Sequence, residues 1–183
     1  LNKHQIPYQK YGGLKLTDTA HVKDIVAYLR VADNPRDAGS WHRLLLLLDG
    51  VGAKLAQRLV DSMSETEDPI SVLEQTTHKQ RAALHRIAAV LRSAQNDAIH
   101  VSDRINLVLH HYAPILSRDY GTEAQQRMDD LRQLGQLSLR SPSLEVFLQD
   151  LTLNPDSSRP RNNPREQDLL TLSTIHSAKG LEW

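Results

Sequence analysis

The chain of 183 residues contains no cysteine, which excludes disulfide bonds, thiol nucleophiles and thiolate metal sites. Aromatic residues make up only 4% of it, and 8 glycines and 8 prolines are too few for a turn-rich β sandwich or a low-complexity segment. Its 22 basic and 22 acidic residues cancel, so any contact with nucleic acid has to come from a local basic patch rather than from an overall positive charge.

Long apolar segments are also missing. No unbroken apolar run exceeds the length of Leu44 to Leu48, which is far short of the ~20 residues of a membrane-spanning helix, and no N-terminal secretion signal is visible. Together with the absence of cysteine, this predicts a cytoplasmic protein with no membrane partner. Because the chain starts at Leu1 rather than at Met and stops at Trp183, we expect a fragment of a longer protein.

The sequence is rich in leucine, with 29 residues, and most of its apolar residues recur at the spacing of one helical face. In the first helix, for example, Val22, Ile25, Val26 and Leu29 share a face, and Thr17 or Asp18 is the expected cap. We predict eight helices: from this cap to Asn34, Asp37 to Leu48, Ala53 to about Met63, Asp68 to about Gln75, Lys79 to about Gln95, Val101 to Leu116, Thr122 to about Leu139, and Ser141 to Leu151.

Strands are expected only at the two ends of the chain. Residues 6–11 place aromatic side chains before a Gly-Gly breaker, and residues 169–175 form an apolar run typical of a strand buried on both faces, hence a parallel one. Residues 154–168 have no apolar side chain and predict a solvated connector. The economical interpretation is a mainly α chain in which a helical domain is inserted into an α/β sheet, the other strands of which lie outside this chain.

The loop after the second predicted strand contains Ser177, Lys179 and Gly180. The carboxyl end of a strand is where ligands bind in open α/β sheets. A hydroxyl, a cation and an approachable backbone suit a phosphate group. From this chemistry alone, a phosphate-binding loop and an ordinary strand-to-helix loop are equally good interpretations.

Two separated segments resemble the same family. The C-terminal Thr-Ile-His-Ser-Ala-Lys-Gly-Leu-Glu-Trp of residues 174–183 is similar to motif V of superfamily 1 DNA helicases of the UvrD/Rep/PcrA type. Four N-terminal segments are similar to the family's sequence at the junction between motor domain 2A and the inserted helical domain 2B. They are Ile6-Pro7-Tyr8, Tyr11-Gly12-Gly13, Val22-Lys23-Asp24 and Ala27-Tyr28-Leu29-Arg30. The resemblance implies a 2B-like domain over residues 17–153, between two strand segments, 1–16 and 169–183, of an incomplete RecA-like motor domain.

Residues 44–60 are similar to a helix-hairpin-helix. In Gly50-Val51-Gly52 two glycines permit a tight turn, and the amides that begin the next helix can receive a DNA phosphate. Lys54 and Arg58 add positive charge. The resemblance implies that this loop holds duplex DNA, and a simple turn between helices is an equally good interpretation.

The resemblance implies a function for the whole protein, namely an ATP-dependent 3′–5′ DNA helicase acting in repair, replication or recombination. It also implies two sets of contacts in motif V: single-stranded DNA for Thr174, His176, Ser177 and Lys179, and the nucleotide for Gly180 and Glu182. Two alternatives remain, the helicase subunit of a RecBCD- or AddAB-like nuclease and a non-enzymatic helix-hairpin-helix DNA-binding module.

The chain lacks the parts that hydrolysis of ATP requires. It has no Gly-x-x-x-x-Gly-Lys-Ser/Thr loop, no apolar strand ending in paired acids and no C-terminal Arg motif. ATP and Mg²⁺ are therefore expected as cofactors of the full-length enzyme, with the remaining helicase domains as partners. We expect no cofactor, no metal site and no catalytic residue in the fragment, and no activity from it in isolation.

Other features have simpler interpretations. His110-His111 lacks neighbouring ligands at zinc spacing, Asp129-Asp130 fits a solvated helix face, and Trp41 beside an apolar run fits a core position better than a base-stacking one. The helix entry departs from the family, because Thr19 and His21 stand where an arginine and an acidic residue are usual, so those family roles are not transferred.

Overall fold

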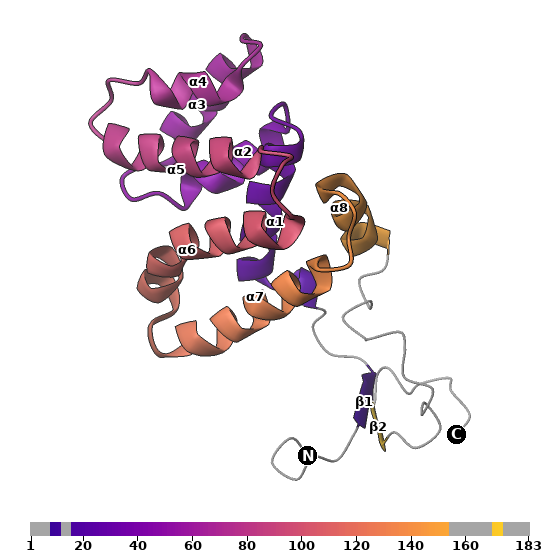
Figure 1. Ribbon diagram of the computed structural model, residues 1–183. Coiled ribbons are helices and arrows are strands. Elements are labelled where there is room, and N and C mark those ends of the chain that lie inside the picture. Colours follow the sequence, from indigo (N-terminus) through magenta and orange to yellow (C-terminus); the bar gives the residue numbers. More distant parts are fainter. Residues whose placement is uncertain (1–7, 12–15, 154–169, 174–183) are drawn as a thin grey trace.

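The computed structural model describes residues 8–11, 16–153 and 170–173, and this part of the chain is mainly helical (Figure 1). Eight α-helices lie between two short strands along this part of the sequence. The strands are β1 (Tyr8–Tyr11) and β2 (Leu170–Ser173). The helices are α1 (Ala20–Asp33), α2 (Ala38–Leu46), α3 (Ala53–Ser64), α4 (Pro69–Glu74), α5 (Arg81–Ala94), α6 (Val101–Tyr120), α7 (Ala124–Ser138) and α8 (Leu144–Leu153).

All eight predicted helices are present, but several boundaries differ. Helix α2, for example, ends at Leu46 rather than at Leu48, and α8 begins at Leu144 rather than at Ser141 and continues to Leu153. The N-cap position of α1 is Thr19, whose side chain makes no capping hydrogen bond, rather than Thr17 or Asp18, because these two residues belong to a 3₁₀ turn, Leu16–Asp18, that precedes it. Helix α6 continues through Pro114 to Tyr120, beyond the predicted end at Leu116. Asp37, predicted as the first residue of α2, is the N-cap of that helix, since its Oδ1 accepts the backbone N–H of Ser40 at 2.9 Å.

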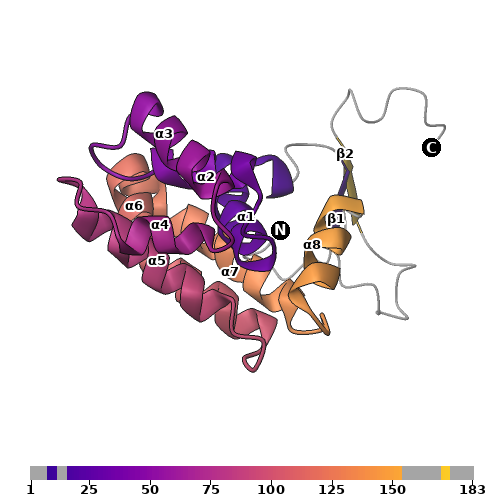
Figure 2. The ribbon, with the colours of Figure 1, turned by 90° about the horizontal axis from the view of Figure 1, so that it is seen from above.

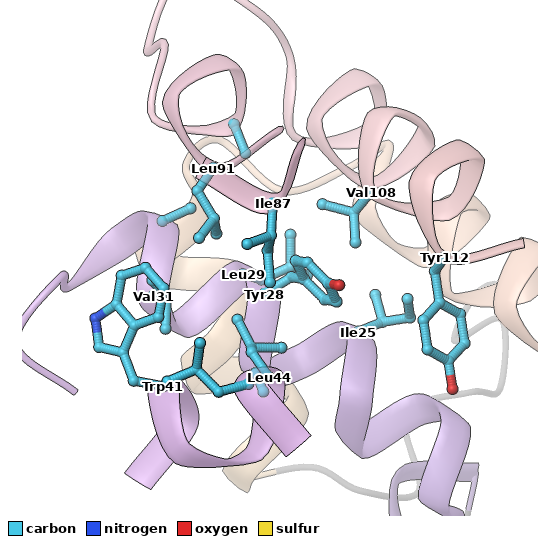
Figure 3. Close-up of a cluster of buried hydrophobic side chains, with 14 of the residues drawn as sticks. Ile25, Tyr28, Leu29, Val31, Trp41, Leu44, Ile87, Leu91, Val108 and Tyr112 are labelled. Carbon is cyan, nitrogen blue, oxygen red and sulfur yellow. The ribbon is translucent and has the colours of Figure 1, made fainter. Parts of the chain in front are cut away.

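Helix α1 is the centre of the helical domain. It packs against α2, α5, α6, α7 and α8, and Figure 3 shows its side chains Ile25, Tyr28 and Leu29 among residues from α2, α5 and α6. The sequence predicted a single apolar face, but Tyr28, Val31 and other residues outside that face are buried too, whereas Val26 is only half-buried. A helix surrounded by neighbours needs buried residues on several sides.

Two polar side chains of α1 are buried with partners from distant helices. Asp24 accepts hydrogen bonds from Arg43 Nε at 2.7 Å and from the Tyr112 hydroxyl at 2.5 Å. His21, at the atypical helix entry, is 1% exposed and lies against Arg127 and Asp130 of α7. Asp130, one of the pair expected on a solvated helix face, is 35% exposed and also contacts the buried His21.

The two strands pair in parallel, as the sequence predicted. Tyr8 lies opposite Leu170 and Tyr11 lies opposite Ser173. The strand that precedes the helices in the sequence therefore pairs directly with the strand that follows them. Figures 1 and 2 both draw this strand pair outside the helices. The predicted connector, residues 154–168, lies outside the described residues.

Candidate nucleic-acid interface

The turn between α2 and α3 is built on Gly50, Val51 and Gly52. Gly50 has φ +74°, a left-handed conformation that favours glycine. The N–H of Val51 donates to the carbonyl of Leu48 at 3.1 Å, and the Val51 side chain is 5% exposed. The middle residue of the loop thus anchors it in the core, and the two glycines are left on the outside.

The two glycines have different surroundings. A Cβ at Gly50 would lie 2.5 Å from Nε2 of Gln80, so this position is closed by a side chain that precedes α5. At Gly52, with φ −86° and ψ 171°, a Cβ would meet no atom of the described residues within 4 Å. Gly50 therefore serves the turn, whereas Gly52 leaves the backbone open to an approaching molecule.

Helix α3 starts directly at this open backbone. The carbonyl of Gly52 accepts the N–H groups of Leu55 at 3.0 Å and Ala56 at 2.9 Å. Within the described part of the chain, the N–H groups of Ala53 and Lys54 have no such acceptor, and no side chain caps the helix. Unengaged amides and the positive end of a helix dipole suit an anion such as a DNA phosphate.

Charges around the turn favour the same ligand. Lys54 and Arg58 are exposed one turn apart on α3, and neither forms an ion pair with a described carboxylate. The turn has its own carboxylate, Asp49, but Arg118 Nη1 binds it at 2.6 Å. The same arginine donates from Nη2 to the carbonyl of Leu47 at 2.9 Å. Arg118 thus links the turn to α6 and pairs with the turn's carboxylate, although Arg118 Nε also binds Asp119 at 2.7 Å.

Sequence reasoning identified Gly50, Val51, Gly52, Lys54 and Arg58, and the structure brings all five residues to the start of α3. It missed Arg118 and Gln80, which position the turn. Arg118 lies 69 residues after Asp49, and no local pattern connects them.

The motif V candidates, Thr174, His176, Ser177, Lys179, Gly180 and Glu182, lie outside the described residues. Trp41 is buried, and its indole N–H donates to the carbonyl of Pro35 at 2.8 Å, which confirms the core interpretation. Among the described residues, no group of three or more His, Asp or Glu side chains is placed to hold a metal ion. In that part of the chain no helix is both long and apolar enough to span a bilayer.

Comparison with known proteins identifies the family. The model of the UvrD-like helicase C-terminal domain matches residues 1–183. The ATP-dependent DNA helicase PcrA of Bacillus subtilis is 28% identical, with 100% of this chain and 28% of the relative covered. PcrA of Staphylococcus epidermidis is 27% identical, with coverages of 99% and 27%, and the ATP-dependent DNA helicase UvrD1 of Mycobacterium leprae is 26% identical, with coverages of 97% and 28%.

The chain therefore spans 27–28% of the length of these curated relatives. The family suggested by motif V and by the N-terminal segments is confirmed. Since the family model matches every residue from Leu1 to Trp183, the chain belongs to the UvrD-like helicase C-terminal domain family.

Proposed function

We propose that the chain is part of an ATP-dependent DNA helicase that moves 3′ to 5′ along one strand. Its helices, residues 17–153, form a 2B-like domain inserted into motor domain 2A, to which the two terminal strand segments and motif V belong. This arrangement is supported by the family and by the parallel pairing of β1 with β2 around the helical segment.

Within that enzyme, the loop at Gly50, Val51 and Gly52 contacts duplex DNA. The observation that carries this proposal is the open backbone at Gly52, where no described atom would meet a Cβ and the first amides of α3 are unengaged. Backbone amides and the cations Lys54 and Arg58 recognise phosphates, so the contact is independent of base sequence and weakens with salt.

A complete nucleotide site does not fit the residues present. The chain has no phosphate-binding Gly-Lys-Ser/Thr loop, and the described carboxylates form no metal-binding group. ATP and Mg²⁺ therefore belong to the full-length protein, with motif V contributing only part of the cleft. The 183-residue chain in isolation is expected to hydrolyse no ATP above background in a steady-state assay with DNA present. Turnover that co-purifies with the folded chain would contradict this assignment.

The duplex contact is tested with the full-length protein and a fluorescein-labelled duplex carrying a single-stranded tail. Gly52→Val places a branched side chain over the open backbone, at φ and ψ values that valine adopts readily. We expect it to weaken binding about tenfold at low salt, and Lys54→Ala to weaken it about threefold.

Gly39→Val is the control, because Gly39 is also an exposed glycine near the start of a helix, and it lies at the end of α2 opposite to the loop. We expect its affinity to match that of the parent. If Gly52→Val and Lys54→Ala fold normally and bind the duplex as tightly as the parent, the loop is only a turn between helices.

A further inference from the structure

The basic side chains of the helical domain fall into two groups. Within the part of the chain that the structure describes, one group forms ion pairs with carboxylates: Arg43, Arg92, Arg104, Arg118, Arg127 and Arg132. The other group has no carboxylate partner there, and five of its members lie on α3 and α5 or directly before α5: Lys54, Arg58, Lys79, Arg81 and Arg86. All five are exposed, so their charge is available to a ligand.

The start of α5 adjoins the turn at Gly50. Gln80 Nε2 lies 2.5 Å from the Cβ position of Gly50, and Lys79 and Arg81 flank this glutamine in the sequence. One turn and a half further along α5, Arg86 lines the same hollow as Asp49 and Arg118. Gln80 and Arg86 therefore adjoin the turn, and Lys79 and Arg81 are the sequence neighbours of Gln80.

Acidic residues gather at the opposite ends of the same helices. On α5, Arg92 is bound by Asp68, and by Glu74 Oε1 at 3.0 Å, and hydrogen bonds from this arginine hold the pKa of both carboxyls below their usual values. Asp61 lies near the C-terminal end of α3 and Glu65 directly follows this helix, so both are C-terminal to Lys54 and Arg58. Among the described residues, the cations of α3 and α5 that lack a carboxylate partner thus lie in the N-terminal half of each helix.

We propose that Lys79 and Arg81 form a second phosphate contact for the duplex, which extends the DNA-binding surface from the start of α3 to the start of α5. This inference rests on the proposed function of the Gly52 loop. The two contacts are joined through Gly50 and Gln80, so one duplex can engage both.

A DNA backbone fits this surface better than a protein partner does. Protein interfaces have an apolar centre, but the large apolar side chains that are exposed among the described residues belong to neither α3 nor α5: Leu46, Leu107, Leu139 and Leu153. Unpaired cations without an apolar centre match the phosphate backbone, because each phosphate contact releases condensed counterions.

The test uses the full-length protein and two labelled probes, a tailed duplex and a single strand of the same sequence. Lys79→Ala with Arg81→Ala is compared with Arg36→Ala with Arg140→Ala, a matched loss of two exposed, unpaired cations elsewhere in the described chain. We expect the first double variant to bind the duplex about tenfold more weakly, with a salt dependence shallower by about two in slope. The affinity of this variant for the single strand, and the affinity of the control variant for the duplex, should stay within about twofold of the parent's values.

Each outcome decides a different point. Equal losses in both double variants would overturn the proposal, because charge alone would explain them. If Lys79→Ala with Arg81→Ala binds normally while Gly52→Val loses affinity, the second contact is wrong and the loop contact stands. If Gly52→Val also binds normally, the proposed function itself fails.

Footprinting of the unmodified protein gives an independent readout. Acylation of lysines is measured by mass spectrometry with and without the tailed duplex. We expect the duplex to protect Lys54 and Lys79 severalfold and to leave Lys23, an exposed lysine of α1, unchanged. Unchanged acylation of Lys79 at saturating duplex would overturn the proposal without any substitution.

Discussion

The hydroxyl of Tyr112 donates a 2.5 Å hydrogen bond to the buried carboxylate of Asp24, which lies 88 residues earlier in the chain. Arg43 binds the other carboxylate oxygen and also donates from Nη2 to the carbonyl of Ala20 at 3.0 Å. One carboxylate thus joins α1, α2 and α6. Asp24 is the last residue of the Val22-Lys23-Asp24 segment that resembles the helicase family, and in the structure it stabilises the packing of these three helices.

Removing either partner of this hydrogen bond is expected to destabilise the chain. Tyr112→Phe should lower the free energy of unfolding by about 1.5–3 kcal/mol, the usual contribution of a hydrogen bond to a charged group. Asp24→Ala should cost more, since it leaves the Tyr112 hydroxyl buried without an acceptor and frees Arg43. Urea unfolding of the 183-residue chain, followed by circular dichroism, measures both changes. Additive losses in the double variant would show that the two groups do not interact.

The buried His21 predicts a dependence of stability on pH. Burial lowers its pKa from the ordinary 6.5; the carboxylate of Asp130 opposes that shift and the guanidinium of Arg127 adds to it. Arg127 Nη1 lies 3.3 Å from Nδ1, so Nδ1 accepts and the ring proton sits on Nε2, which faces Asp130 Oδ2 at 3.4 Å. If Nδ1 were protonated, its N–H would face the N–H of Arg127 Nη1, and the two donors would lack an acceptor between them.

The unfolded chain therefore takes up a proton at His21 more readily than the folded chain does. Stability should fall as the pH drops below about 6.5, and it should be fully present above that value. His21→Gln is expected to flatten this part of the pH profile of urea midpoints. His85→Gln, which removes an exposed imidazole, is the control. A profile of His21→Gln that parallels the parent would show that another group is responsible; His111, also lowered in pKa by burial, is the next to test.

The two glycines of the turn should respond differently to alanine. Gly50→Ala forces a Cβ into a left-handed conformation and against Gln80, so we expect a loss of about 1–2 kcal/mol in the free energy of unfolding. Gly52→Ala meets open space at an ordinary φ and should change stability by less than about 0.5 kcal/mol. Urea midpoints of the two variants decide this, and equal losses would contradict the separation of a structural glycine from an exposed one.

In the full-length enzyme, the two sides of motif V are expected to fail separately. His176→Ala should weaken binding of single-stranded DNA and DNA-stimulated ATP turnover, with nucleotide affinity nearly unchanged. Glu182→Ala should lower nucleotide affinity about tenfold, in line with a desolvated carboxylate hydrogen bond of about 1.5–3 kcal/mol, and leave DNA affinity nearly unchanged. Measuring both affinities for both variants tests this. Proportional loss of both affinities in each variant would make the loop a structural support.

Helix positions and strand direction followed from the sequence because they depend on local signals. Apolar spacing located all eight helices, glycine and proline marked their breaks, and a run without polar alternation indicated a parallel strand. The Gly50-Val51-Gly52 turn was recognisable for the same reason, since the glycines that permit its tight backbone conformation are close together in the sequence. The family was recognisable from two short segments at opposite ends of the chain.

Only the tertiary structure decided which of these features serve the fold and which face outward. Both glycines of the turn look alike in the sequence, yet the Gln80 side chain lies against one and no described residue covers the other. Asp24 lies within α1 and Asp49 lies in the turn after α2, and the arginine that pairs with each of them is brought there by packing. The exposure of a side chain and the net charge around it depend on all the residues that lie near it in space. Those residues are determined by how the other helices pack around α1, and no local sequence pattern specifies that packing.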